Sequence, residues 1–121
     1  MPYIAVMSKP PIHTIIETAA FTAQASRIGV SQTELAAIYD QYASEASYGK
    51  VIRHTGGLRK GRVGKDATGK SGGYRVFSFY ADDANPVFLL WVIDKSADAT
   101  LTDAQEKAFK QMTTALKEAL R

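Results

Sequence analysis

The spacing of apolar and polar residues predicts a short strand and a short helix early in the chain. Residues 12–17 (IHTIIE) are rich in β-branched side chains, which favour an extended strand. Thr18 has the side chain of a helix N-cap and Gly29 is typical of a helix end, so a helix is predicted between them. The apolar face of this helix would hold Phe21, Ala25 and Ile28.

A second helix is predicted from Ser31 onward. Ser31 and Glu34 form a capping-box pattern, in which each side chain bonds the backbone N–H of the other residue. Apolar residues then recur at the helical spacing i, i+3, i+4 and i+7, at Leu35, Ile38, Tyr39 and Tyr42. We interpret both tyrosines as core residues and Gly49 as the end of the helix.

The second half of the chain has the pattern of an antiparallel sheet. Residues 58–63, which lie between glycine turns, and residues 73–80 (GYRVFSFY) each predict a strand. Residues 86–93 (PVFLLWVI) form a continuous apolar run, which is typical of a central strand buried on both faces. The short polar turn at residues 82–85 should join the last two strands into an antiparallel hairpin.

A closing helix completes the pattern. Thr102 and Gln105 repeat the capping box, and Asp103 suits the positive end of a helix dipole. The apolar stripe of this helix consists of Ala108, Phe109, Met112, Leu116 and Leu120. The order of helices, strands and a final helix predicts an α+β fold, with a small, mainly antiparallel sheet packed against two N-terminal helices and a C-terminal helix.

Composition adds a few limits to this picture. A chain of 121 residues, 45% hydrophobic and 10% aromatic, predicts one globular domain over residues 1–121, with residues 1–11 as an irregular lead. The absence of cysteine excludes disulfides and thiolate chemistry. The lead lacks the features of a signal peptide, and no apolar run has the ~20 residues of a membrane span. We therefore expect a cytoplasmic protein.

Positive charge is concentrated in one stretch, from Lys50 to Arg75. This stretch holds eight basic residues and one acid, whereas the whole chain has a net charge of only +3. Seven of the nine glycines also lie in it. Clustered like charges repel one another, and a polyanion relieves that repulsion. Glycine lets a backbone approach a ligand closely, so the stretch indicates contact with phosphates.

Residues 64–71 (GKDATGKS) match the phosphate-loop pattern of nucleotide triphosphatases, but we reject that interpretation. The loop needs a helix directly after it, whose N-terminus holds the phosphates. Here Gly72 and Gly73 follow, and then a strand pattern, which will not start a helix. A basic loop between two strands is the better interpretation.

Other candidates for chemistry are few. His13 is expected to be structural in the first strand, whereas His54 lies in the basic stretch and could act as a general acid or base. The two histidines lack the neighbours of a metal site, and no nucleophilic-serine motif is present. We interpret residues 82–83 (DD) as turn residues and Trp91 as a core residue.

Two motifs carry a resemblance to a known family. They are GGLRKGR at residues 56–62, preceded by Thr55, and GKSGGYR at residues 69–75, followed by Val76; LL at 89–90 and LT at 101–102 add to them. Over residues 12–120 the chain resembles the RelE/HigB-type toxins of bacterial type II toxin–antitoxin modules, in their HigB-like branch. The resemblance implies a RelE-like fold and a metal-independent, cofactor-free endoribonuclease (mRNA interferase) that inhibits translation, in many members on the ribosome. It also implies an antitoxin partner, commonly with a helix-turn-helix domain.

The resemblance also implies particular site residues. The arginine of its G-G-x-R motif falls on Arg75, which would contact the scissile phosphate, and the basic pair of the preceding strand falls on Lys60 and Arg62. Further RNA contacts are expected from Arg59, Lys65, Lys70, Tyr74, Tyr80 and Lys95. The family's next arginine is Ser96 here, and its tyrosines after the motif are Ser78 and Phe79. The general acid and base are therefore not assigned.

These residues fit RNA cleavage by the substrate's own 2′-OH, which needs neither a serine nor a metal. Arg62 and Arg75 would stabilise charge on the phosphoryl oxygens. Lys60 could be the base only if neighbouring cations disfavoured its charged form. Two alternatives stay open: a ParE-like poison of DNA gyrase, and a non-catalytic relative that binds RNA or an antitoxin.

Overall fold

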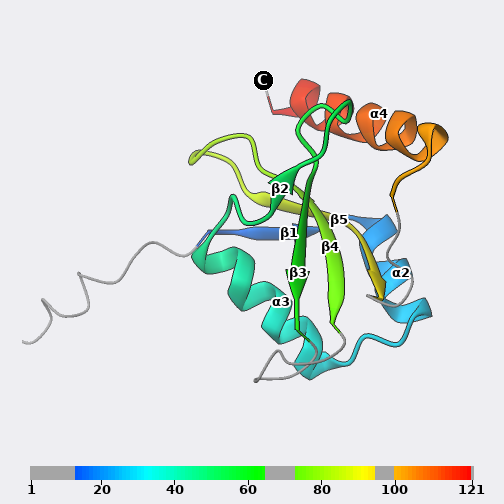
Figure 1. Ribbon diagram of the computed structural model, residues 1–121. Coiled ribbons are helices and arrows are strands. Elements are labelled where there is room, and N and C mark those ends of the chain that lie inside the picture. Colours follow the sequence, from blue (N-terminus) through cyan, green and yellow to red (C-terminus); the bar gives the residue numbers. More distant parts are fainter. Residues whose placement is uncertain (1–12, 65–72, 95–99, 121) are drawn as a thin grey trace, which may run out of the picture.

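The computed structural model describes residues 13–64, 73–94 and 100–120 (Figure 1). The expected irregular lead, residues 1–11, lies outside this part of the chain. The described elements, in chain order, are β1 (Ile15–Glu17), α2 (Ala19–Arg27), α3 (Gln32–Ser44), β2 (Lys50–Val51), β3 (Arg59–Val63), β4 (Tyr74–Phe79), β5 (Val87–Asp94) and α4 (Asp103–Ala119). They confirm the α+β class, with two helices before most of the strands and one after them.

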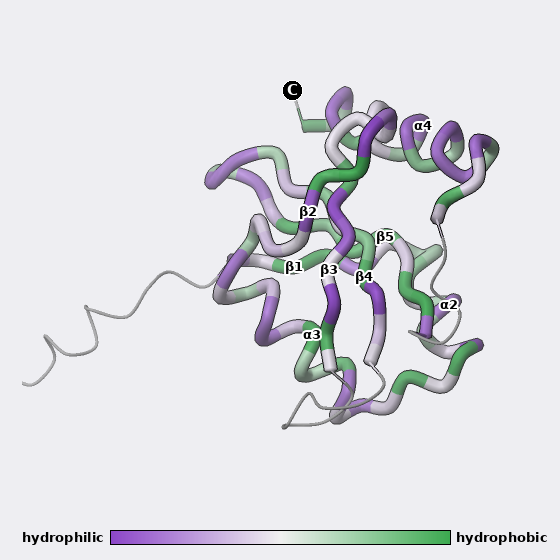
Figure 2. The backbone as a smooth tube through the Cα atoms, in the orientation of Figure 1, coloured by the Kyte–Doolittle hydropathy of each residue, from purple (hydrophilic) through white to green (hydrophobic). Residues whose placement is uncertain are grey.

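The five described strands form one mixed sheet in the order β1-β5-β4-β3-β2. Three neighbouring pairs are antiparallel, and only β1 and β5 are parallel. The sheet is therefore mainly antiparallel, and β4 and β5 form the predicted hairpin. β5 lies between β1 and β4, as its continuous apolar run predicts. Figure 2 shows the contrast between this hydrophobic strand and the hydrophilic residues of β3.

Each face of the sheet has its own apolar cluster. On one face, α2 and α3 contribute Phe21, Ala25, Ile38 and Tyr42 to a cluster with Val63, Tyr74, Val76, Val87, Leu89 and Val92. On the other face, Phe109 of α4 joins Leu58, Phe77, Phe79, Phe88 and Leu90. We call these the α2/α3 face and the α4 face. Figure 1 shows α4 at one end of the sheet, beside the loop that joins β2 to β3.

Local capping explains where the helices begin. Thr18 caps α2 by accepting from Phe21 N, and both predicted capping boxes are present, at Ser31 and at Thr102. Gly29 ends the first helical segment with a φ of 79°, a left-handed conformation that glycine adopts without strain. None of the described helices is long and apolar enough to cross a membrane.

The prediction that Gly49 ends α3 is wrong, because the helix stops at Ser44. The Ser44 hydroxyl bonds back to Asp40 O at 2.9 Å, and Glu45 has a non-helical φ of −141°. Gly49 serves a different purpose. A Cβ at Gly49 would lie 2.8 Å from Lys60 O, so this glycine permits a close approach of two backbones.

Candidate nucleic-acid interface

Four basic residues lie on one face of the sheet because of the strand register. Side chains alternate along a strand, so Lys60 and Arg62 of β3 point to the same face, the α4 face that Leu58 also occupies. Arg62 lies directly opposite Arg75 of β4, and Lys60 lies directly opposite Lys50 of β2. Residues directly opposite one another share a face. Two cross-strand pairs of like charge therefore stand side by side.

Such pairs oppose folding, since like charges directly opposite one another on a sheet are destabilising. Here they border an open pocket of about 490 Å³. The described residues that line this pocket are Glu45, Tyr48, Gly49, Lys50, Lys60, Gly61, Arg62 and Arg75. Among these, Glu45 is the one acid. An anion with several charges would relieve the repulsion, and the volume is within the ~300–1,000 Å³ typical of ligand sites.

One wall of the pocket lies beyond the end of β2, where the edge of β3 is not paired with β2. β2 pairs with β3 only through Lys60 and Arg59, so Gly61 and Arg62 extend beyond it. The Tyr48 hydroxyl donates to Arg62 O at 2.7 Å, which satisfies this edge carbonyl. Tyr48, Glu45 and Lys50 line the pocket but were not among the predicted site residues. Lys50 belonged to the basic stretch, but Tyr48 reaches β3 through a contact that no local pattern shows.

A family model described as the RelE toxin of the RelE / RelB toxin-antitoxin system matches residues 13–121. The chain belongs to the RelE toxin family. It is therefore a toxin of a toxin–antitoxin system and has an antitoxin as its partner. The motifs that carried the resemblance contribute Lys60, Gly61, Arg62 and Arg75 to the basic pocket.

Arg59 of this RelE-family toxin lies away from the pocket. It follows Leu58 and precedes Lys60, so strand alternation directs it to the α2/α3 side. Its Nη1 donates to Ser47 O at 3.0 Å and to Gly49 O at 3.1 Å. Arg59 thus holds the segment that carries the pocket wall, and it is not among the pocket-lining residues.

The two tyrosines expected to contact RNA also lie on the α2/α3 face. Tyr74 is 3% exposed and its hydroxyl donates to Glu34 at 2.9 Å. Burial, together with the Glu34 carboxylate, raises the pKa of Tyr74 to about 12. Tyr80 packs at the edge of the same cluster, and its hydroxyl donates to Asp83. Neither tyrosine lines the basic pocket, so we leave both out of the proposed interface.

Three expected RNA contacts, Lys65, Lys70 and Lys95, lie outside the described residues. So does most of the phosphate-loop pattern. After it, Gly73 leads directly into strand β4, so no helix stands between Gly73 and Phe79 in the described chain. A phosphate loop of the nucleotide-binding kind lacks its helix there.

The loop between β2 and β3 is tightly built, and α4 packs on it. The Thr55 hydroxyl donates to Ile52 O at 2.6 Å and accepts from Leu58 N at 3.2 Å. Thr113 of α4 donates to Thr55 O at 2.7 Å. His54 is exposed in this loop with a φ of 64°, outside the ordinary range for a non-glycine residue, and does not line the pocket.

The remaining candidates have structural surroundings. His13 lies just before β1 rather than in it, and its ring meets the Tyr80 ring edge-on at 5.6 Å. Asp82 forms the predicted turn by accepting from Ala84 N at 2.9 Å. The described part of the chain holds no group of three or more acidic or histidine side chains placed to bind a metal ion.

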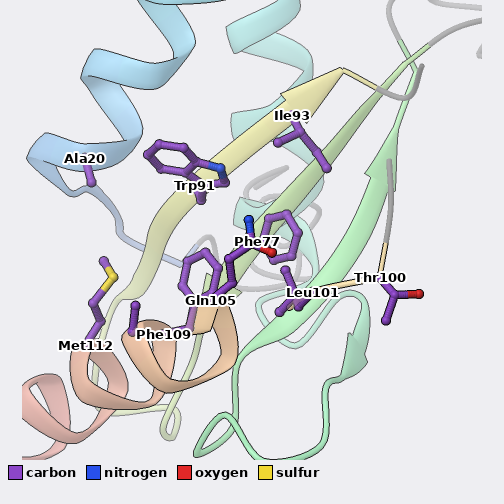
Figure 3. Close-up of a pocket in the computed structure, with 10 residues that line it drawn as sticks. Ala20, Phe77, Trp91, Ile93, Thr100, Leu101, Gln105, Phe109 and Met112 are labelled. Carbon is purple, nitrogen blue, oxygen red and sulfur yellow. The ribbon is translucent and has the colours of Figure 1, made fainter. Parts of the chain in front are cut away.

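A second pocket lies between α4 and the sheet (Figure 3). It measures about 330 Å³, and Figure 3 shows Phe77 and Trp91 from the sheet facing Phe109 and Met112 from α4. None of the described residues that line it is charged. Its described lining offers no cation to a phosphate, so the basic pocket is the better candidate site.

Proposed function

We propose that this RelE-family toxin is a metal-independent endoribonuclease that cleaves mRNA at the basic pocket. The observation that carries the proposal is the pair of like-charged cross-strand neighbours, Lys50 with Lys60 and Arg62 with Arg75, at one open pocket. Sheet stability alone does not favour this arrangement. A ribose–phosphate backbone, with one negative charge per nucleotide, is a ligand that would relieve it.

The proposed reaction uses the substrate's own nucleophile. The 2′-oxygen of one ribose attacks the adjacent phosphorus and loses its proton, while the bond from phosphorus to the 5′-oxygen breaks and that oxygen gains a proton. The products are a 2′,3′-cyclic phosphate and a 5′-hydroxyl. The protein then has to position the backbone and stabilise charge on the phosphoryl oxygens.

Arg62 and Arg75 suit this task. A guanidinium keeps its charge and offers two parallel N–H groups to a phosphate. Because the two arginines are directly opposite on neighbouring strands, they can hold one phosphoryl group from two sides. Lys60 adds a positive charge two residues from Arg62 on the same face, beside the attacking or leaving oxygen.

Other parts of the proposal rest on the sequence alone. Lys65, Lys70 and Lys95 are proposed as further contacts to the RNA backbone because of their charge and position in the chain. We also propose that this protein belongs to the HigB-like branch, acts in the cytoplasm and is neutralised by an antitoxin with a helix-turn-helix domain. Cleavage could take place on free mRNA or on mRNA held by the ribosome.

The test is end-mapping of RNA treated with the purified toxin, as free RNA in the presence of EDTA and as ribosome-bound RNA in a buffer with the Mg²⁺ that ribosomes need. We expect new 5′-hydroxyl ends, and none where the nucleotide before the cut carries a 2′-deoxy or 2′-O-methyl ribose. Arg75→Ala should lower the cleavage rate by at least ~100-fold, the scale seen when one transition-state donor is removed. Arg53→Ala is the matched control, because Arg53 is an exposed arginine outside the pocket.

Other outcomes would replace the proposal. Loss of DNA supercoiling without RNA cleavage would support the gyrase alternative. Antitoxin binding with neither activity would support a non-catalytic relative. Cleavage that Arg75→Ala leaves intact would place the reaction outside the basic pocket.

A further inference from the structure

Tyr48 is the one aromatic residue among the described residues that line the basic pocket. It lies in the segment between α3 and β2, next to the edge of the sheet, and is half-buried. Its ring packs against the α2/α3 cluster, whereas Lys60 and Arg62 point to the α4 face, so the pocket that all three line lies around the edge of β3. An aromatic ring beside a row of cations is the combination that proteins use to hold single-stranded nucleic acid, with the cations on the backbone and the ring on a base.

The ring of Tyr48 is fixed in place from three directions. Its hydroxyl donates to Arg62 O at 2.7 Å, and its ring meets the Tyr42 ring edge-on with centroids 5.7 Å apart. A Cβ at Gly61 would lie 2.7 Å from Tyr48 Cδ2 and Cε2, so the ring packs directly on the glycine backbone. Because Arg59 holds Ser47 O and Gly49 O, the chain on both sides of Tyr48 is also tied to β3.

We propose that Tyr48 is the platform on which one base of the bound RNA stacks, an inference that rests on the proposed RNA site. A ring that is already ordered costs little conformational entropy when a base stacks on it. Stacking depends on the face of a base rather than on its hydrogen-bonding edge, so the site would accept different bases with modest preference. The base would belong to a nucleotide next to the phosphate that Arg62 and Arg75 hold.

A purely structural role is the competing explanation. Tyr48 covers the bare edge of β3, and a tyrosine that only braced this edge would need its hydroxyl on Arg62 O. The ring shares in the bracing, because it packs on Gly61 and against Tyr42. Removing the base from the RNA leaves this packing intact, so a comparison of intact and abasic RNA separates stacking from bracing.

The experiment measures binding of a short RNA in which every ribose is 2′-O-methylated, so that no cleavage can occur. Tyr48→Phe keeps the ring and should bind within about 2-fold of the wild type. Tyr48→Leu keeps an apolar side chain without the ring, and should bind about 5- to 100-fold more weakly, the range for loss of one base–aromatic stack. The same RNA with a single abasic residue at the stacked position should bind wild type and Tyr48→Leu equally.

A scan of abasic positions on the wild-type protein gives a second test that needs no variant, in case Tyr48→Leu does not fold. We expect one position at which loss of the base weakens binding about 5- to 100-fold. Equal binding by wild type and a folded Tyr48→Leu, or an abasic scan with no such position, would overturn the platform while leaving the RNA site in place. Failure of the wild type to bind the RNA at all would overturn both.

Discussion

Residues near the pocket of this toxin have two different roles. Some fix the pocket wall through hydrogen bonds, and others line the pocket. Arg59 and Arg62 show the division, because they are three positions apart in β3 and lie on opposite sides of the sheet. Arg59 bonds two backbone carbonyls, whereas the exposed Arg62 lines the pocket. The same type of side chain should therefore give different phenotypes at the two positions.

We predict that Arg59→Ala lowers the free energy of unfolding by about 1–3 kcal/mol, because it removes charge-assisted hydrogen bonds to Ser47 O and Gly49 O. Arg62→Ala should change stability by less than ~0.5 kcal/mol, as is usual for an exposed position, while lowering RNA cleavage. Urea unfolding and a cleavage assay on both variants check this. Equal stability losses would show that Arg62 is also a structural residue.

Gly61 must be a glycine because its neighbours leave no room for a side chain. A Cβ there would lie 2.7 Å from the Tyr48 ring and 2.8 Å from the Tyr42 hydroxyl. We predict that Gly61→Ala destabilises the fold by about 1–3 kcal/mol through overpacking. Denaturant unfolding measures this, with Ser47→Ala, at an exposed position nearby, as the control. A neutral Gly61→Ala would mean that Tyr48 moves aside at little cost.

Tyr74 gives a pH-dependent prediction. Burial and the Glu34 carboxylate raise its pKa from 10.0 to about 12, so the folded state favours the neutral phenol. The stability from this preference is fully present below pH 10 and is lost as the pH rises through about 12. Stability measured across this window should fall less steeply in Tyr74→Phe than in the wild type. An identical slope in the two proteins would contradict the assigned cause.

At the scale of elements, locally encoded features could be predicted and non-local ones could not. The capping boxes of α3 and α4 depend on residues three positions apart, so they were visible in the sequence and the structure confirms them. β2 has only two residues and exists because β3 pairs with it, so no periodic pattern could show it. The bulge in β5 also depends on a distant partner strand, so it could not be predicted. Phe77 pairs with Trp91 and Ser78 with Leu89, which leaves Leu90 as the extra residue.

The face of each site residue could have been predicted more fully than it was. Side chains alternate between the two faces of a strand. This alternation places Lys60 and Arg62 on one face and Arg59 on the other, and it places Tyr74 and Arg75 on different faces. The position of Tyr48 could not be predicted, because it depends on how the segment after α3 returns to β3. Gly49 was predicted to end a helix and Gly61 to belong to a phosphate-contacting stretch, whereas in the structure each permits a close contact with a distant residue.

The docking of α4 on the loop between β2 and β3 gives a prediction about elements. Thr113 is fully buried and its hydroxyl donates to Thr55 O at 2.7 Å. Thr113→Val preserves the shape but leaves this buried carbonyl without its donor, which should cost about 1–3 kcal/mol. Thr113→Ser keeps the hydroxyl and should retain more stability, as judged by thermal unfolding. The reverse order would show that the methyl group, not the hydrogen bond, holds α4.

At the scale of the whole molecule, two apolar clusters support the sheet from both faces and leave one stretch of the α4 face basic and open. α4 covers the apolar end of that face through Phe109, while Lys60, Arg62 and Arg75 stand at the pocket. The stability of the two clusters offsets the repulsion among the cations. The fold can thus carry a charge arrangement that would be unfavourable in an isolated hairpin.

The most direct test of the proposed RNA site is to measure how binding to a fully 2′-O-methylated RNA depends on salt concentration. Each phosphate contact contributes about −0.7 to the slope of log K against log salt for a single strand. We predict that Lys60→Ala, Arg62→Ala and Arg75→Ala each make the slope shallower by about 0.7, while Arg53→Ala, outside the pocket, leaves it unchanged. Equal slopes for the wild type and the three pocket variants would contradict the claim that these cations together hold an RNA backbone.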